Sequence, residues 1–263
     1  MQRIVDNVQI HIPFRMLLES YLDHFIENRF NPEIYFSSDV LDNYTAYDFN
    51  KVAEKLHHHG LKMTLHSPFW DLAPGSPDSA VRDLTKHRFE QTVRLVSIFK
   101  PTTIVCHAGY DRKRYGSIKD VWVKNSLNMW AWLSEKISAE GSHLMLENVF
   151  EQDPDDILIL LENLNSKRIG CCLDVGHHAV FGRASITQWI DDLGHHIKQL
   201  HLHDNFGERD EHLALGDGAI NFAKIFVLLK HLNDRPIITI EPHKEQDLAP
   251  SLQYLEKIWP WAR

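Results

Sequence analysis

The chain has 263 residues, of which 43% are hydrophobic, and a formal net charge of −8 at pH 7. This length and composition predict one domain over residues 1–263 with a substantial core. We find no signal-peptide pattern and no apolar run long enough to span a membrane, and the three cysteines lie in apolar runs, so we expect a cytoplasmic protein. The acidic balance disfavours DNA as a partner, because phosphate binding normally requires a basic face.

Short β-rich apolar runs alternate with longer amphipathic stretches along the chain. We expect strands over 8–12, 33–37, 62–66, 103–107, 144–148, 170–174, 198–202 and 237–241. Between them, the spacing of apolar residues predicts helices, for example over 15–28, 48–60 and 80–100. Eight strand–helix units predict an α/β fold, a (β/α)8 TIM barrel. A doubly wound open sheet is the alternative, but its glycine-rich turn after the first strand is missing.

Acidic and histidine side chains occur at the ends of six successive predicted strands. These residues are His66, His107, Glu147, Asp174, His201 and Glu241, and His177 follows Asp174 by three positions. The carboxyl ends of barrel strands form the mouth at which active sites lie, so we expect these side chains to meet there. Without cations they would repel one another and lose solvation, so the pattern predicts bound divalent ions.

The segment 201–218, HLHDNFGERDEHLALGDG, adds further candidate ligands after the seventh strand. His201 and His203 share one side of the strand because side chains alternate. Asp210 and His212 are spaced to bind one ion together, and the glycines that follow allow a tight turn. Nine candidates exceed the roughly four ligands that zinc uses, so we expect two or three ions. Zinc is the first choice, and manganese or iron are alternatives.

Seven short motifs carry these residues. They are LHSP (65–68), VCHAG (105–109), LEN (146–148), CLDVGH (172–177), HLHD (201–204), DEHLALGDG (210–218) and IEP (240–242). Together they resemble the xylose isomerase-like barrel superfamily, including its AP endonuclease family 2 branch, the endonuclease IV enzymes, over nearly the whole chain.

The resemblance implies how the ions would be shared. Endonuclease IV binds three zinc ions, and all nine of its ligand positions are matched here. By this likeness one ion belongs to His66, His107 and Glu147, a second to Glu147, Asp174, His201 and Glu241, and a third to His177, Asp210 and His212. The chain departs from endonuclease IV in lacking basic insertions that would grip DNA.

Two enzymatic functions are compatible with this pattern. The number of ligands favours a hydrolase acting on a phosphate-ester or phosphoribosyl bond of a small sugar-phosphate- or nucleotide-like substrate, with Glu147 positioning water between two ions. DNA cleavage at abasic sites is the version that the net charge disfavours. The alternative is a sugar or sugar-phosphate isomerase or epimerase with one ion, in which Glu147 and Glu241 move protons. A non-enzymatic, metal-stabilised barrel is a third interpretation, but such an open cluster is costly unless it is used.

Other residues are weaker candidates for substrate contacts. His203 is expected to orient a metal ligand or to touch the substrate. Arg112 and Arg114, and separately Arg209, are candidates for holding a phosphate, although an ordinary solvated loop is the favoured interpretation of the first two. Trp70 and Phe69 are expected either to form a wall against a sugar or base ring or to cap the barrel.

Overall fold

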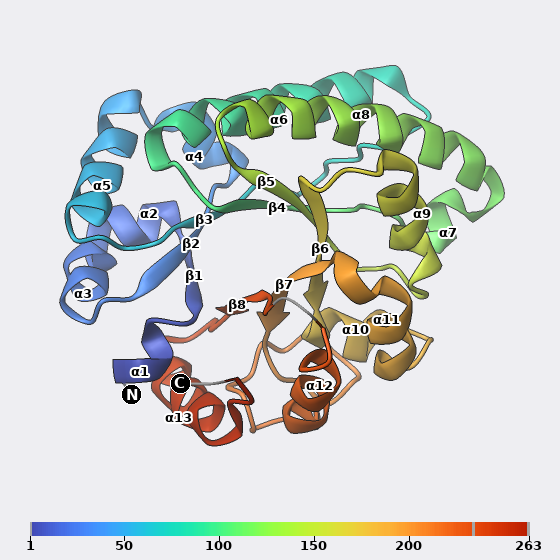
Figure 1. Cartoon of the computed structure of the whole chain (residues 1–263). Coiled ribbons are helices and arrows are strands. Elements are labelled where there is room, and N and C mark those ends of the chain that lie inside the picture. The colour runs from blue at the N-terminus through green and yellow to red at the C-terminus, as the bar shows by residue number, and fades with distance from the viewer. Residues whose placement is uncertain (1, 233–234, 262–263) are drawn as a thin grey trace.

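The structure, a computed structural model, describes residues 2–232 and 235–261. Eight parallel strands form a closed barrel in sequential order (Figure 1). They are β1 (Gln9–Pro13), β2 (Asn31–Tyr35), β3 (Thr64–His66), β4 (Thr103–His107), β5 (His143–Glu147), β6 (Ile169–Asp174), β7 (Ile197–Leu202) and β8 (Ile237–Ile240). Pairing of Gln9 with Thr239 and of Ile10 with Ile240 closes the barrel, which confirms the (β/α)8 prediction and excludes the open sheet.

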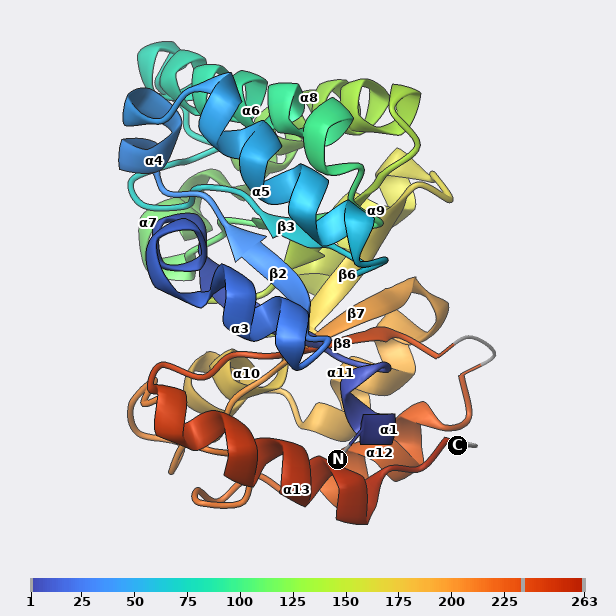
Figure 2. The ribbon, with the colours of Figure 1, turned by 90° about the vertical axis from the view of Figure 1, so that its left-hand side faces the viewer.

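Helices cover the outside of the barrel, as the two views together show (Figures 1 and 2). They are α1 (Gln2–Val5), α2 (Phe14–Met16), α3 (Leu22–Glu27), α4 (Ser38–Asn43), α5 (Ala46–His58), α6 (Ser79–Phe99), α7 (Arg112–Tyr115), α8 (Lys119–Ala139), α9 (Asp155–Leu164), α10 (Val175–Phe181), α11 (Ile186–Leu193), α12 (Phe222–Leu229) and α13 (Leu248–Ile258). Short turns of other helix types are η1 (Leu17–Tyr21), η2 (Gly116–Ile118), η3 (Gly194–His196) and η4 (Glu245–Asp247). None of the described helices is both long and apolar enough to cross a membrane.

The predicted element boundaries differ from the structure in several places. The strand predicted over 33–37 begins earlier, at Asn31, because Asn31 and Pro32 pair with Gln9 and Ile10 of β1. The helix predicted over 15–28 is confirmed, since α2, η1 and α3 follow one another without a gap, but its middle, η1, is π-helical. The helix predicted over 48–60 is α5, which begins two residues earlier at a capping box of Thr45 and Asp48.

The interior of the barrel has a polar layer directly below the mouth. Glu33 is fully buried, and its Oε2 accepts hydrogen bonds from Thr64 Oγ1 at 2.9 Å and from Thr239 Oγ1 at 2.9 Å. Gln199 Nε2 also donates to this oxygen, at 2.5 Å. Another part of the core is apolar, with Val105, Met145 and Cys172 in one cluster. The barrel therefore supports its mouth from below with one buried carboxylate.

Candidate metal centre

The strands bring the predicted ligands to one end of the barrel. His66, His107, Glu147 and Asp174 are the last residues of β3, β4, β5 and β6, His201 is the last but one in β7, and Glu241 directly follows β8. Pairing places His107 beside Glu147 and Asp174 beside His201. His177 lies in the first turns of α10, and Asp174 is the N-cap of that helix, accepting a hydrogen bond from the His177 N–H at 2.6 Å.

The first of three neighbouring groups, the main centre, consists of Glu147, Asp174, His201 and Glu241. His201 Nδ1 lies 3.1 Å from Glu147 Oε1, 2.9 Å from Glu241 Oε1 and 4.0 Å from Asp174 Oδ2. Three carboxylates therefore face one imidazole nitrogen. This is a donor set that suits a divalent cation.

The second group, the upper site, consists of His66, His107 and Glu147. Glu147 Oε2 lies 3.0 Å from His66 Nε2 and 3.4 Å from His107 Nε2. Since the other oxygen of Glu147 faces His201, this carboxylate links the upper site to the main centre. The arrangement is the bridging one that the resemblance implied.

The third group, the loop site, consists of His177, His203, Asp210 and His212. Asp210 Oδ2 lies 3.4 Å from His177 Nε2 and 3.3 Å from His212 Nε2. His203, which the sequence analysis left outside the ligand set, is the fourth member of this group. In the upper site and the loop site, candidate ligand atoms all lie within 4.8 Å of one another. In the main centre this holds for Glu147, Asp174 and His201, while Glu241 forms such a group with His201 and Glu33.

The burial of the candidate ligands and the pairing of their polar atoms indicate whether they suit metal ions. Glu147 is 1% exposed, and Asp174, His201 and His203 are buried. Among the described side chains, Asp174 Oδ2 and both ring nitrogens of His203 are buried without a hydrogen-bond partner. Leaving buried polar atoms unpaired is costly. A bound divalent ion would satisfy these atoms and balance the carboxylates, so the residues fit metal ions.

The electrostatics favour ionised acids and at least one neutral imidazole. Burial raises the pKa of the Glu147 carboxyl, but His201 and His107 outweigh this effect and hold the pKa well below its usual range. Burial lowers the pKa of His107 to about 3, so this ring stays neutral at pH 7. A carboxylate and a neutral imidazole are the protonation states that bind metal ions.

Three polar residues near the mouth were missed by the sequence analysis. Glu33 Oε1 on β2 lies 2.8 Å from His201 Nε2, and His11 on β1 lies edge-on to His66 with ring centroids 5.9 Å apart. His243, after β8, stacks on His212 at 3.7 Å. For His11 and Glu33 the sequence did hold an indication. Side chains alternate along a strand, and both residues fall on the inward side of theirs.

The weaker substrate candidates lie on the rim. Arg112 Nη2 pairs with Asp153 Oδ2 at 2.7 Å, and the Arg114 guanidinium lies over the Tyr115 ring, so both have partners on the protein surface. Arg209 is exposed on the loop after β7. Trp70 is 73% exposed. Their contact with a substrate stays a prediction.

The ring that contacts the site beside Trp70 is Phe69. It stacks on His107 with ring centroids 4.2 Å apart, whereas Trp70 packs against Phe69 at 5.5 Å. Of the two aromatic residues predicted to line the pocket, Phe69 is thus the one in direct contact with a candidate ligand, and contact of either with a substrate stays a prediction.

The loop after β7 is organised by one buried carboxylate, Asp204. Its Oδ2 accepts hydrogen bonds from the N–H groups of Gly216 at 2.9 Å and Gly218 at 3.0 Å, and its Oδ1 accepts from Ile220 at 3.1 Å. A Cβ on Gly218 would meet Asp204 Oδ1 at 2.3 Å, so this position requires glycine. His212 adopts φ +48°, a left-handed conformation that is uncommon for non-glycine residues, although histidine adopts it more readily than most.

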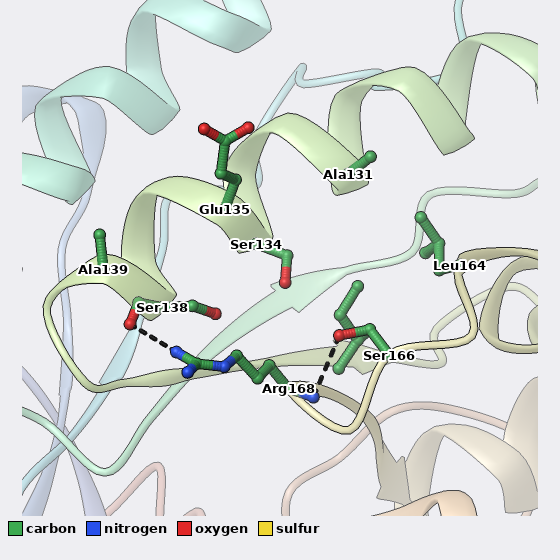
Figure 3. A pocket seen from close by; sticks show the side chains of 9 residues that line it. Ala131, Ser134, Glu135, Ser138, Ala139, Leu164, Ser166 and Arg168 are labelled. Atoms are coloured by element: carbon green, nitrogen blue, oxygen red, sulfur yellow. Dashed lines mark hydrogen bonds between the residues drawn. The ribbon is translucent and has the colours of Figure 1, made fainter.

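A hollow at the opposite end of the barrel offers no comparable chemistry. It lies between the C-terminal part of α8 and the start of β6, and Arg168 donates a hydrogen bond to the Ser138 carbonyl at 2.7 Å (Figure 3). This end contains the amino ends of the strands, where residues of TIM barrels serve stability rather than catalysis.

The closed barrel and its clusters of buried acids and histidines define a TIM barrel with metal-binding sites at its mouth. The family profile of the xylose isomerase-like TIM barrel matches residues 30–258. The chain belongs to this family, which confirms the resemblance drawn from the sequence.

Relatives and solved structures agree with this membership. MJ1614, an uncharacterized protein of Methanocaldococcus jannaschii, is 30% identical over 205 residues, which cover 75% of this chain and 78% of that protein. MJ1311 of the same organism is 28% identical over 204 residues, covering 75% of this chain and 70% of that protein.

Among solved structures, a D-tagatose 3-epimerase-like protein superposes with a TM-score of 0.81 at 24% identity, covering 95% of this chain and 96% of that one. The TTHB071 protein of Thermus thermophilus, from a crystal soaked with ZnCl2, gives 0.82 at 24% identity, with 98% and 99% covered. A D-psicose 3-epimerase gives 0.73 at 16% identity, with 96% and 90% covered. These likenesses concern the fold.

Proposed function

We propose that this protein is a metal-dependent sugar isomerase or epimerase that acts at the main centre. The observation that carries this proposal is the placement of Glu147 and Glu241 on either side of His201, with an oxygen of each within 3.1 Å of the same ring nitrogen. Glu147 ends β5 and Glu241 directly follows β8, and β6 and β7 lie between these two strands in the barrel. They can thus reach a bound sugar from two directions.

The chain's own residues supply the proton transfer in this proposal. Burial raises the pKa of Glu241, but His201 outweighs this effect and keeps the carboxyl ionised, as it does Glu147. One carboxylate takes the proton from a carbon next to the sugar carbonyl, and the other returns a proton. A bound divalent ion would polarise the sugar oxygens and make that carbon more acidic.

Fold comparisons support the sugar reaction over the hydrolase that the ligand count alone favoured. Several structural neighbours are named as sugar epimerases or as like one, among them the D-psicose 3-epimerase and the D-tagatose 3-epimerase-like protein. We infer a sugar substrate by analogy with these names. Arg112, the proposed phosphate clamp, already pairs with Asp153, which favours an uncharged sugar over a sugar phosphate.

Hydrolysis of a phosphate-linked substrate is the second candidate, and one observation favours it. His177, Asp210 and His212 converge within the loop site, and a single-ion isomerase has no need of an additional site. Two or three close cations would suit water activation and phosphoryl binding. Such an enzyme would hydrolyse small phosphate esters or nick abasic DNA.

The test is proton exchange into sugars. Purified protein reconstituted with zinc or manganese is incubated in D2O with a panel of ketopentoses, ketohexoses and their phosphates, and deuterium at carbon is measured by NMR. We expect incorporation into at least one sugar, and a loss of roughly 100-fold or more in Glu241→Gln. Glu54→Gln, an exposed change on α5, is the matched control and should behave like the wild type. Silence across the panel together with hydrolysis of phosphate esters would favour the second candidate.

A further inference from the structure

The phenylalanine and tryptophan side chains that are exposed, among the described residues, all lie on loops at the barrel mouth. Trp70 is 73% exposed and follows β3, Phe150 is 51% exposed and follows β5, and Phe206 is 60% exposed and follows β7. The other described side chains of these two types are buried or half-buried. Large exposed rings that gather at one end of a molecule mark a surface that a ligand or a partner covers.

Trp70 begins a series of ring contacts that ends at the upper site. Its ring packs against Phe69 with centroids 5.5 Å apart, and Phe69 stacks on His107 at 4.2 Å with the rings 18° from parallel. We call these three residues the Trp70 wall. Since His107 Nε2 lies 3.4 Å from Glu147 Oε2, this wall extends from solvent to one oxygen of a proposed catalytic carboxylate.

A second series of rings, the Phe150 wall, consists of Phe150, Phe181 and His177. Phe150 packs edge-on against Phe181 at 5.0 Å, and Phe181 lies 6.3 Å from His177. His177 Nδ1 lies 3.5 Å from Glu147 Oε1, the other oxygen of that carboxylate. The two walls therefore meet at Glu147, where the His107 and His177 rings are 6.3 Å apart.

The two walls lie on either side of β4. Phe69 and Trp70 follow β3, whereas Phe150 follows β5 and Phe181 ends α10, after β6. A group that extends outward from Glu147 between these loops would thus have aromatic rings on two sides.

The surroundings of the walls suit an uncharged group. The two arginines of the loop after β4 already have partners, since Arg112 pairs with Asp153 and Arg114 lies over the Tyr115 ring. The outer members of both walls are aromatic side chains without a charge. Such rings bind another flat ring well, either stacked on its face or against its edge.

We propose that the substrate is a keto sugar that carries a flat, uncharged aromatic substituent, which binds to the outer rings of the two walls. The inference rests on the proposed sugar reaction, because it places the sugar carbonyl at the main centre beside Glu147. A sugar held there has His107 and His177 as the nearest rings of the walls. Trp70 and Phe150 lie farther out, and a second ring on the substrate would cover them.

The experiment compares phenyl glycosides with methyl glycosides of glucose, galactose, mannose and xylose. These probes have no free carbonyl, so they bind without reacting, and isothermal titration calorimetry measures their affinity for the zinc-reconstituted protein. We expect at least one phenyl glycoside to bind about tenfold or more tightly than its methyl counterpart, the usual gain from stacking one flat ring on aromatic side chains. Phenol alone should bind more weakly than that glycoside, because the sugar also contributes.

Two variants test the walls separately. Trp70→Ala and Phe150→Ala should each weaken binding of the phenyl glycoside by roughly fivefold or more and leave the methyl glycoside within about twofold. Tyr47→Ala, which removes a 76% exposed ring from the outer helix α5, is the matched control and should bind both probes like the wild type. Equal binding of phenyl and methyl glycosides by the wild type, or a full phenyl preference in either wall variant, would overturn the proposal.

A second copy of this chain is the other occupant that exposed rings could bind, and sedimentation velocity tests it. Pairing of two mouths would close the entrance to the main centre, so we expect a sedimentation coefficient that Trp70→Ala leaves unchanged. A wild-type dimer that becomes a monomer in Trp70→Ala, together with no phenyl preference, would overturn the proposal in favour of self-association.

This inference and the sugar reaction fail separately. Phenyl glycosides bind without turnover, so a phenyl preference with no deuterium exchange into any sugar would count against the proton transfer and keep the aromatic binding surface. Deuterium exchange into free ketoses, with phenyl and methyl glycosides bound equally, would count against the aromatic substituent alone.

Discussion

Glu33 Oε1 lies 2.8 Å from Nε2 of His201, and both side chains are fully buried. The other nitrogen of His201 faces the carboxylates of the main centre. The imidazole is thus held between a supporting carboxylate below the mouth and the proposed ligands within it. This is the arrangement by which a carboxylate sets the orientation and basicity of a metal-binding histidine.

Replacing this supporting carboxylate should weaken metal binding without removing a proposed ligand of the main centre. We expect Glu33→Gln to reduce the zinc affinity of the main centre by roughly 10–100-fold, the usual effect of losing a residue that orients a ligand. Titration against a chelator of known affinity measures the change. Thr64→Val is the control, because Thr64 contacts only the other Glu33 oxygen, and its affinity should stay within a few-fold of the wild type. Equal affinities for Glu33→Gln and the wild type would contradict this role.

Gly176 leaves room for the ring of His203, so Gly176→Ala should displace that ring. A Cβ on Gly176 would lie 2.1 Å from His203 Cε1, inside α10 where the backbone cannot easily move. We expect a loss of about 1–3 kcal/mol in the free energy of unfolding, measured by urea denaturation, from overpacking. Gly116→Ala is the control, since its nearest neighbour would be Arg112 Cγ at 3.5 Å, an ordinary contact. Comparable stability of both variants would show that His203 moves aside at no cost.

Asp204→Asn should loosen the loop after β7. The two oxygens of Asp204 accept four backbone hydrogen bonds, two on each oxygen. An amide has one oxygen, so two buried N–H groups would face an NH2 group, at about 1–3 kcal/mol each. We expect faster hydrogen exchange at Gly216 and Gly218 and a lower free energy of unfolding. Asp217→Asn, an exposed neighbour in the same loop, should change neither, and equal exchange in the two variants would argue against this account.

The sequence predicted the barrel and the position of the site well, because both depend on local patterns. Short apolar runs marked each strand, and the ligand-type residues at strands three to eight are all at the mouth. The role of Glu33 could not be predicted, because it depends on which residues of β2 and β7 meet across the interior of the barrel. His203 was visible in the sequence, but its place beside Asp210 depends on the path of a loop that no periodicity describes.

Glu151 gives a prediction on pH that does not involve the metal sites. It is 1% exposed, and its two oxygens accept hydrogen bonds from the N–H groups of Tyr110 at 2.8 Å and Val149 at 2.7 Å, joining the loops after β4 and β5. Burial raises the pKa of this carboxyl to about 7, despite those bonds. Since the ordinary pKa of the carboxyl is 4.5, the folded state binds the extra proton between about pH 4.5 and 7.

The contribution of Glu151 to the free energy of unfolding should therefore be fully present below about pH 4.5 and be lost as the pH rises through 7, by up to about 3 kcal/mol. Glu151→Gln cannot titrate, so the free energy of unfolding of the wild type minus that of the variant should fall between about pH 5 and pH 8. Urea denaturation at one-unit intervals and fixed zinc concentration measures this difference. Glu140→Gln, an exposed change at the end of α8, should give a flat difference over the same range. A flat difference for Glu151→Gln as well would mean that the carboxyl is already ionised at about pH 5, held so by its two backbone donors.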